Sequence, residues 1–205
     1  MNLGYFSYPL PVNEQVKSYA PGSTEKISLK KTLLELKSRE HDIPAIIGGK
    51  EIRSGNKVKM RPPHELTHTL GYFHRSDKND ILLAIEAALK AKPSWEKMNW
   101  ENRAAVFLKA ADLLSGTYRD LLNGTTMLGQ SKNVYQAEID SACELIDFLR
   151  FNVHYLHEIY KQQPVSSPGV HNRLEYRPLE GFVLAITPFN FTAIGGNLPT
   201  SAALC

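Results

Sequence analysis

The stretch EGFVLAITPFNFT, residues 180–192, decides the fold expected for this chain. Within it, residues 182–187 form an almost unbroken apolar run, rich in residues that favour strands, and Pro188 ends that run. A short continuous run of this kind is typical of a strand buried on both faces, as in the parallel sheet of an α/β protein. The sequence therefore predicts a buried strand at residues 182–187.

Asn190 follows this predicted strand, on a turn that Pro188 fixes. In open α/β sheets, ligands bind just beyond the carboxyl ends of the strands. An amide held rigidly in a dry setting between Phe189 and Phe191 would be a good donor to a developing oxyanion, and losing such a donor costs roughly 3 kcal/mol of barrier. Asparagine is also a common turn residue. The residues alone leave both interpretations open, an oxyanion donor and a structural turn contact.

Composition excludes several other classes of protein. The 205 residues are 42% hydrophobic and 22% charged, with a net charge of +3, and the basic residues are scattered. This pattern predicts no nucleic-acid partner and no membrane-surface partner. No apolar run approaches the ~20 residues that span a bilayer, and residues 1–10 resemble neither a secretory signal nor a transit peptide. Two cysteines, Cys143 and Cys205, suit a reducing compartment.

The first 52 residues predict three local structures. Residues 1–30 contain three prolines and little periodicity, which indicates an extended arm, and residues 29–36 then form a short amphipathic helix. Residues 45–52 carry β-branched residues on both sides of Gly48-Gly49, which is typical of a β-hairpin. We expect the arm and helix to occupy residues 1–44, and one domain to occupy residues 45–205.

Residues 64–74 match H-E-x-x-H-x-x-G-x-x-H, a zinc-binding pattern of metalloproteases. On a helix, His64 and His68 would ligate zinc together with His74, and Glu65 would act as general base. Two prolines directly precede the pattern, so a helix could not extend upstream. On a strand, His64 and His68 would lie about 13 Å apart, too far to share one zinc ion. A zinc metallohydrolase and a metal-free extended segment are the two alternatives.

Helical patterns dominate the middle of the chain. Asp77 or Asp80 is expected to cap a first helix that Pro93 stops, and further helices are predicted at residues 99–115, 117–128 and 134–160. The predicted inward face of the first helix consists of Ile81, Ile85, Ala88 and Leu89.

The helix at residues 134–160 carries two lines of side chains at helical spacing. The first is a predicted buried seam made of Ile139, Ala142, Ile146, Leu149, Val153 and Leu156. The second is an aromatic stripe headed by Glu144, which is either solvated at the edge of the stripe or aimed into a site. Cys143 is expected to be a small core residue, because no basic residue lies beside it at helical spacing.

Residues 162–169 are a predicted loop, and residues 174–177 alternate like a short strand that leads into the apolar run. A helical part followed by consecutive strands indicates an α/β domain.

Several motifs together resemble the aldehyde dehydrogenase family. RPLEG at residues 177–181 and ITPFNF at residues 186–191 resemble the family as a whole. TAIGGNL at residues 192–198 resembles its Δ1-pyrroline-5-carboxylate dehydrogenase branch, which oxidises L-glutamate γ-semialdehyde to glutamate in proline degradation. Residues 107–116 and 126–140 also look like the family, so the likeness covers essentially the whole chain.

The resemblance implies a fold and a site. It implies the N-terminal part of a Rossmann-like NAD-binding domain with a preceding helical segment, incomplete as it stands. Asn190 would donate to the thiohemiacetal oxyanion, while Glu144 and Phe191 would bind the aldehyde substrate. The nicotinamide end of NAD would be lined by the backbone of Ile186, Thr187, Pro188 and Phe189. The histidine segment would be extended and metal-free.

The family's chemistry is covalent: a cysteine thiolate attacks the aldehyde, a hydride passes to NAD, and a glutamate-activated water hydrolyses the thioester. That cysteine and that glutamate lie further along a full-length member, and Cys205 lacks the nucleophile's sequence context. We therefore expect the 205-residue polypeptide to be inactive and poorly folded alone. At full length we expect a homo-oligomer in the cytoplasm, with the mitochondrial matrix as the alternative compartment. A non-catalytic oligomerisation module is a further alternative function.

Overall fold

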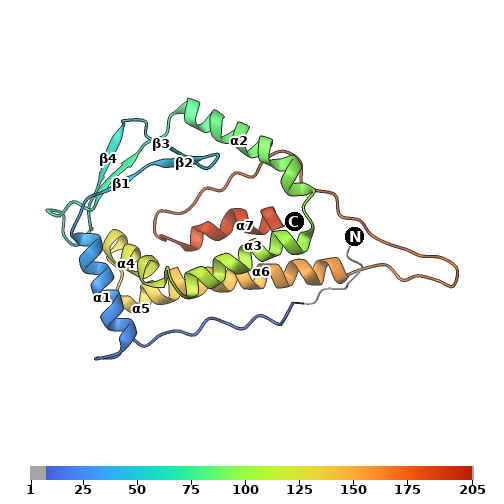
Figure 1. Ribbon diagram of the computed structural model, residues 1–205, viewed down its shortest axis with the longest axis horizontal. Helices are drawn as coiled ribbons and strands as arrows, with labels where there is room; N and C mark the ends of the chain where they lie inside the picture. Colours follow the sequence, from blue (N-terminus) through green and yellow to red (C-terminus); the bar gives the residue numbers. More distant parts are fainter. Residues whose placement is uncertain (1–7, 205) are drawn as a thin grey trace.

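The computed structural model describes residues 8–204, without the side chains of residues 201–203. Helices form the middle of the molecule, small sheets lie at one end, and a long arm leaves the other end (Figure 1). The helices are α1 (Thr24–Lys37), α2 (Lys78–Glu96), α3 (Trp100–Ser115), α4 (Arg119–Gln130), α5 (Val134–Ala137), α6 (Glu144–Lys161) and α7 (Leu198–Leu204). Two shorter helical segments are the π-helix η1 (Glu138–Cys143) and the 3-10 helix η2 (Ile194–Asn197). The strands are β1 (His41–Ile43), β2 (Ala45–Ile47), β3 (Lys50–Ile52), β4 (Lys57–Met60) and β5 (Gly71–His74).

The core lies between α3 and α6, which run side by side (Figure 1). The seam predicted for the long helix is confirmed at five of its positions, which are buried: Ala142, Ile146, Leu149, Val153 and Leu156. The prediction for the first seam position is wrong, because Ile139 is 43% exposed. Residues 138–143 form a π-helix with wider turns than an α-helix, which shifts the phase of the inward face. Glu138 consequently points inward and Ile139 points outward.

Helix α2 differs from its prediction in two ways. Of the two predicted caps, Asp77 is the one that begins the helix, in a reciprocal capping box with Asp80. Pro93, however, lies inside the helix, and the ion pair between Lys92 and Glu96 (2.6 Å) spans it on the surface. The predicted inward face of α2 is also wrong, because none of its residues is buried and Ile81 is 57% exposed. In the described chain this helix packs mainly against β2, which leaves most of its apolar side chains uncovered.

The sheets are small and local. Strand β5 pairs in parallel with β1 and antiparallel with β4. Gly71 faces His41 so closely that a Cβ atom would lie 2.0 Å from the His41 carbonyl oxygen, so only glycine fits there. The predicted hairpin is confirmed: β2 and β3 pair antiparallel across Gly48 and Gly49, whose φ angles are 57° and 77°.

The predicted strand at residues 182–187 is wrong for the described chain, and so is the short strand at residues 174–177. Both segments lack regular structure, and Leu184 and Ile186 are 74% and 79% exposed. A strand needs neighbours that accept and donate its backbone hydrogen bonds. Neither of the two sheets in the described residues includes this segment. The apolar run is therefore extended and open.

The chain from Gln162 to Ala193 forms a long loop that leaves the end of α6 and comes back to the helices. It turns at Pro168 and Gly169, where Ser167 and Val170 form an isolated bridge, and then runs back along the helices (Figure 1). At the other end of the sequence, residues 8–20 are extended as predicted. The predicted arm is too long, however, because α1 begins at Thr24, where Ser23 caps it, five residues before the predicted start of the helix.

Candidate functional site

The turn at residues 189–192 is held by the last residue of α4, Gln130. The Gln130 side-chain amide faces two backbone N–H groups and two oxygens of this turn, and one orientation pairs every donor with an acceptor. In that orientation Oε1 accepts from the N–H groups of Phe191 (3.1 Å) and Thr192 (3.2 Å). Nε2 donates to the carbonyl oxygen of Asn190 (3.1 Å) and to the Thr192 hydroxyl (3.3 Å). Gln130 thus binds the backbone of Asn190 and of the two residues that follow it.

Lys132 holds the same turn through an aromatic ring. Its Nζ lies 4.1 Å from the centre of the Phe191 ring, within cation–π distance, and 2.7 Å from Oδ2 of Asp140. Lys132 and Asp140 are both largely buried, with 16% and 28% of their side chains exposed. The ion pair orients the ammonium group, and the ammonium group in turn fixes the face of Phe191.

Glu144, the first residue of α6, lies one helical turn beyond Asp140 and is half-buried. Burial, followed by the negative charge of Asp140, raises the pKa of the Glu144 carboxyl. The charge of Lys132 acts in the opposite direction. The sequence left two interpretations of Glu144, a solvated edge and a side chain enclosed near a site. Its partial burial and raised pKa favour the enclosed position. Lys132 links the surroundings of Glu144 to those of Phe191.

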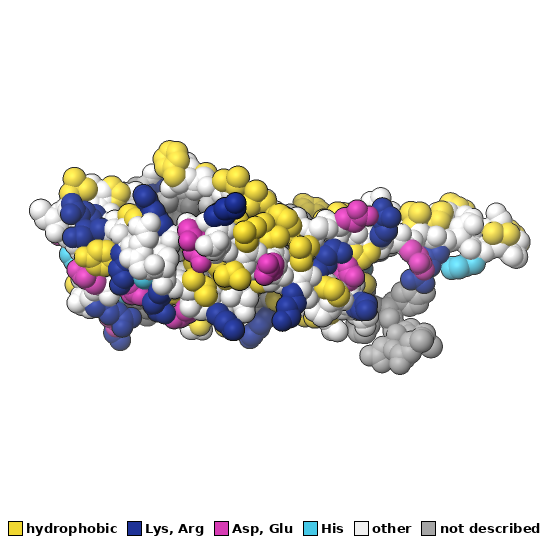
Figure 2. All heavy atoms as spheres, turned by 90° about the horizontal axis from the view of Figure 1, so that it is seen from above, with side chains coloured by type: hydrophobic (Ala, Val, Ile, Leu, Met, Phe, Trp, Pro, Cys, Tyr) yellow, Lys and Arg dark blue, Asp and Glu magenta, His cyan; other side chains and the backbone are white. Residues whose placement is uncertain are grey.

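Asn190 does not have the dry, aromatic setting expected from the sequence. Its side chain is exposed, and Phe189 beside it is 96% exposed. That expectation is wrong for the described chain, because no described residue covers this side of the turn. Hydrophobic side chains gather on the face seen from above, the side of α2 (Figure 2). The large exposed apolar residues of α2, of the predicted strand and of the turn that follows it are Ile81, Leu82, Leu83, Leu89, Phe182, Val183, Leu184, Ile186 and Phe189.

The structure contradicts the zinc interpretation of residues 64–74. Residues 63–68 form turns rather than a helix, and only residues 71–74 are a strand. The histidines have separate partners: His64 Nδ1 lies 2.8 Å from the Ser131 hydroxyl, and His74 Nε2 lies 3.2 Å from Oδ1 of Asp42. Within residues 8–204 there is no cluster of three His, Cys, Asp or Glu side chains that could hold a metal ion.

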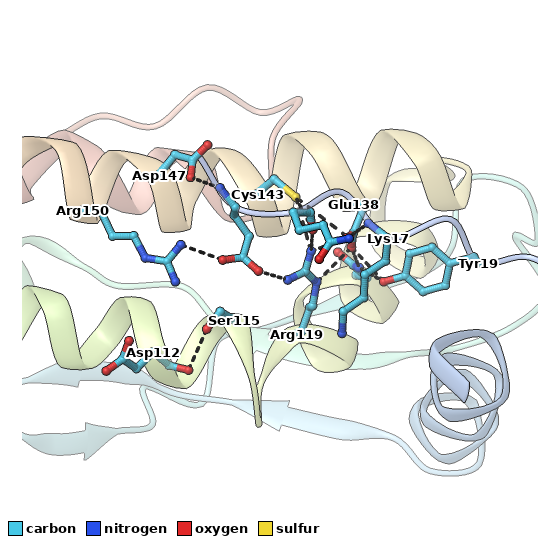
Figure 3. A network of polar contacts seen from close by, with 12 residues as sticks. Lys17, Tyr19, Asp112, Ser115, Arg119, Glu138, Cys143, Asp147 and Arg150 are labelled. Atoms are coloured by element: carbon cyan, nitrogen blue, oxygen red, sulfur yellow. Dashed lines mark hydrogen bonds and ion pairs between the residues drawn. The ribbon is translucent and has the colours of Figure 1, made fainter. Parts of the chain in front are cut away.

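The main polar feature that the sequence did not reveal is a buried network around Arg119 (Figure 3). The Arg119 guanidinium forms ion pairs with Glu138 and, at 2.5 Å, with Glu14 from the N-terminal arm. Glu138 also accepts hydrogen bonds from the Tyr19 hydroxyl (2.8 Å) and from the amide of Asn123 (2.7 Å). Burial alone would raise the pKa of Glu138, but its hydrogen bonds, that from Arg119 first, outweigh burial and lower the pKa.

This network fastens the N-terminal arm to the helices. Asp147 accepts from the backbone N–H of Glu14 (2.6 Å) and from the side chain of Asn13 (2.7 Å), and Arg150 pairs with Glu14 at 2.7 Å. Each of these contacts joins residues more than 100 positions apart, so no local spacing predicts them. One signal was present, because Glu138 precedes the buried residues Ala142 and Leu145 by four and seven positions.

Cys143 is buried, as the sequence predicted. Burial, and then the negative charge of Glu138, raises the pKa of its thiol to about 11. Arg119 lies 3.4 Å from the sulfur, a contact that helical spacing could not reveal, but its charge does not reverse the shift. At neutral pH this cysteine is a protonated core residue and is unsuited to nucleophilic attack.

A profile of the Aldehyde dehydrogenase family matches residues 52–204. The chain belongs to that family. This confirms the α/β class expected from the sequence, although most of the described regular structure is helical. Within residues 8–204, no helix is both long and apolar enough to cross a membrane.

Individual relatives extend the likeness over almost the whole chain. It is 53% identical over 204 residues to the Δ1-pyrroline-5-carboxylate dehydrogenase of Agaricus bisporus. That match covers 98% of this chain and 37% of the relative. It is 47% identical over 192 residues to the mitochondrial enzyme of that name from Homo sapiens, with 94% of this chain and 34% of the relative covered.

A solved structure agrees closely with the fold. The Δ-pyrroline-5-carboxylate dehydrogenase from Mycobacterium tuberculosis bound with NAD has a TM-score of 0.95 and 49% sequence identity. The match covers 98% of this chain and 38% of that structure. This chain therefore spans well under half the length of the relatives that it matches.

Proposed function

We propose that this chain forms part of an NAD-dependent dehydrogenase that oxidises L-glutamate γ-semialdehyde, formed from Δ1-pyrroline-5-carboxylate, to glutamate in proline degradation. The observation that carries this proposal is the 53% identity over 98% of the chain to a relative with that name. Because the matched region is 37% of the relative, the complete activity would need chain beyond the matched region.

The turn at residues 189–192 would supply the oxyanion donor. Asn190 would present its side-chain NH₂ to the aldehyde oxygen as that oxygen becomes negative during nucleophilic attack. Phe191 would pack on the aliphatic part of the substrate, and its ring is already fixed by Lys132. Glu144, whose raised pKa reflects partial burial, would lie at the edge of the same pocket. The exposed side of the turn would be covered by chain that corresponds to the remainder of the relatives.

The apolar run would bind the cofactor. Ile186, Thr187, Pro188 and Phe189 are exposed and extended, which fits a backbone edge on which a flat ring could lie. Thr187 packs against Gly195, where a Cβ atom would lie 2.8 Å from the Thr187 methyl carbon, so this edge has a defined position. NAD, when bound, supplies the acceptor for the hydride that leaves the aldehyde carbon.

The thiolate nucleophile would come from a cysteine outside the described residues. Cys143 does not suit the role because its thiol is buried and has a raised pKa. Cys205 lies outside the described residues, and we do not assign the role to it. This division of roles supports the expectation that the 205-residue chain is inactive alone.

The compartment and the assembly are also proposals. Relatives from Dictyostelium discoideum, Emericella nidulans and Homo sapiens are named mitochondrial, which favours the mitochondrial alternative over the cytoplasm. The proposed reaction makes a small aldehyde, L-glutamate γ-semialdehyde, the binding partner of the full-length protein. A homo-oligomer at full length and a domain boundary between residues 44 and 45 stay predictions. No observation favours the non-catalytic oligomerisation module.

The substrate proposal can be tested on a completed chain, defined here as residues 1–205 joined to the portion of the Agaricus bisporus relative that follows its matched region. We expect kcat/KM for L-glutamate γ-semialdehyde to exceed that for butanal by about 100-fold or more, because butanal lacks the amino and carboxylate groups that a specific site would bind. NADH absorbance measures both rates. Equal kcat/KM values for the two aldehydes would contradict the proposed substrate.

A further inference from the structure

Gln130 makes an unusual set of contacts for a residue at the end of a helix. Its amide bonds in both directions to three successive residues of a turn about 60 positions away in sequence, at 3.1–3.3 Å. The amide nitrogen donates and the amide oxygen accepts, so an apolar side chain of the same shape or a carboxylate could not make the same four hydrogen bonds.

The end of helix α4 that carries Gln130 is well anchored, whereas few other side chains hold the turn at residues 189–192. Helix α4 is anchored by Leu128 and Thr126, which are buried, and the next residue, Ser131, contacts His64 at 2.8 Å. The turn, by contrast, follows the open segment 182–188, and both Phe189 and Asn190 are exposed. Apart from the Lys132 contact with Phe191, the Gln130 amide is the main side-chain contact that fixes the backbone at residues 190–192.

We infer that Gln130 is a positioning residue, which holds the backbone of Asn190 so that the side-chain NH₂ points to the developing oxyanion. This inference rests on the proposed function of Asn190. The Gln130 amide nitrogen binds the carbonyl oxygen of Asn190 itself, and its oxygen binds the N–H groups of Phe191 and Thr192. The peptide plane that follows Asn190 and the next plane, on either side of the Phe191 Cα, are therefore fixed. An oxyanion donor acts only from a narrow range of positions, and a displacement of about 1 Å can cost up to about 100-fold in rate.

The first test is Gln130→Met in the completed chain, which keeps side-chain length and helix propensity but removes all four hydrogen bonds. We expect kcat to fall by about 10- to 100-fold with KM changed less than about threefold, because the donor is displaced and the substrate contacts remain. Gln162→Met is the matched control, because Gln162 is exposed at the end of α6, and it should leave kcat unchanged.

A double-mutant cycle separates positioning from general structural damage. If Gln130 acts through Asn190, adding Gln130→Met to Asn190→Ala should change kcat by less than about twofold. Two effects that multiply would overturn the inference, because Gln130 would then act independently of Asn190.

Amide hydrogen exchange provides a readout that does not depend on activity. In the completed chain, Gln130→Met should speed exchange at the N–H groups of Phe191 and Thr192 at least about tenfold while exchange within α4 stays unchanged. Unchanged exchange at those two groups overturns the inference, whatever the kinetics.

A wild-type rate in Asn190→Ala overturns the proposed role of Asn190 and the inference with it. A slow Asn190→Ala enzyme with unchanged exchange in Gln130→Met overturns the inference alone.

Discussion

Replacing Asn190 by alanine in the completed chain is expected to lower kcat by about 100- to 1000-fold, or roughly 2.7–4 kcal/mol of barrier. The amide would stabilise charge that exists only after the thiolate has attacked, so its loss should affect the transition state far more than substrate binding. KM should therefore stay within a few-fold of the wild-type value. Asn190→Asp should be at least as slow, because a carboxylate would repel the oxyanion.

The control for this experiment is Asn102→Ala, which makes the same chemical change at an exposed position on α3. Its kcat should match that of the wild-type protein. Steady-state NADH formation with L-glutamate γ-semialdehyde measures all the variants. A kcat for Asn190→Ala within about threefold of wild type would be incompatible with an oxyanion donor at this position.

Replacing Glu138 by glutamine is expected to destabilise the fold by about 3–5 kcal/mol. Glu138 is fully buried and pairs with Arg119, which is itself only 1% exposed. Without the carboxylate, the Arg119 guanidinium would stay buried with Glu14 as its one remaining ion-pair partner among the described residues. Urea unfolding of the completed chain, followed by circular dichroism, measures the change. The exposed Glu40→Gln is the matched control and should shift the free energy of unfolding by less than about 0.5 kcal/mol.

The same variant should change how stability depends on pH. The pKa of Glu138 is lowered in the folded chain, so its contribution to stability is present above the ordinary value of 4.5 and is lost as pH falls below it. The wild-type chain should therefore lose this contribution on acidification, and Glu138→Gln should lack that part of the pH dependence. Identical acid-side curves for the two proteins would show that the pKa of Glu138 is not lowered by the network.

Local signals allowed much of the fold to be predicted from the sequence. The Gly48-Gly49 turn predicted its hairpin because two positive φ angles favour glycine at both positions. Asp77 predicted the start of α2 because a side-chain oxygen there can bind free N–H groups at the helix start. Five of the six seam positions of the long helix followed from spacing alone. These features depend on residues a few positions apart.

Several of the failures depend on contacts between distant parts of the chain. Residues 182–187 have the composition of a buried strand, but composition does not supply the neighbouring strands that a ladder needs. At the π-helix of residues 138–143 Glu138 points inward to meet Arg119, whereas the predicted seam places Ile139 inward. Within the candidate site, the sequence singled out Asn190 but not Gln130, because their contact joins the end of α4 to a turn far along the chain.

The most direct test of the proposed function is NADH formation from L-glutamate γ-semialdehyde, measured side by side for the purified 205-residue chain and the completed chain. We predict no rate above the enzyme-free background for the 205-residue chain and clear turnover for the completed chain. Cys143→Ala in the completed chain should preserve that turnover, because the buried thiol is not the nucleophile. Turnover by the 205-residue chain alone, or a folded completed chain that forms no NADH, would contradict the proposal.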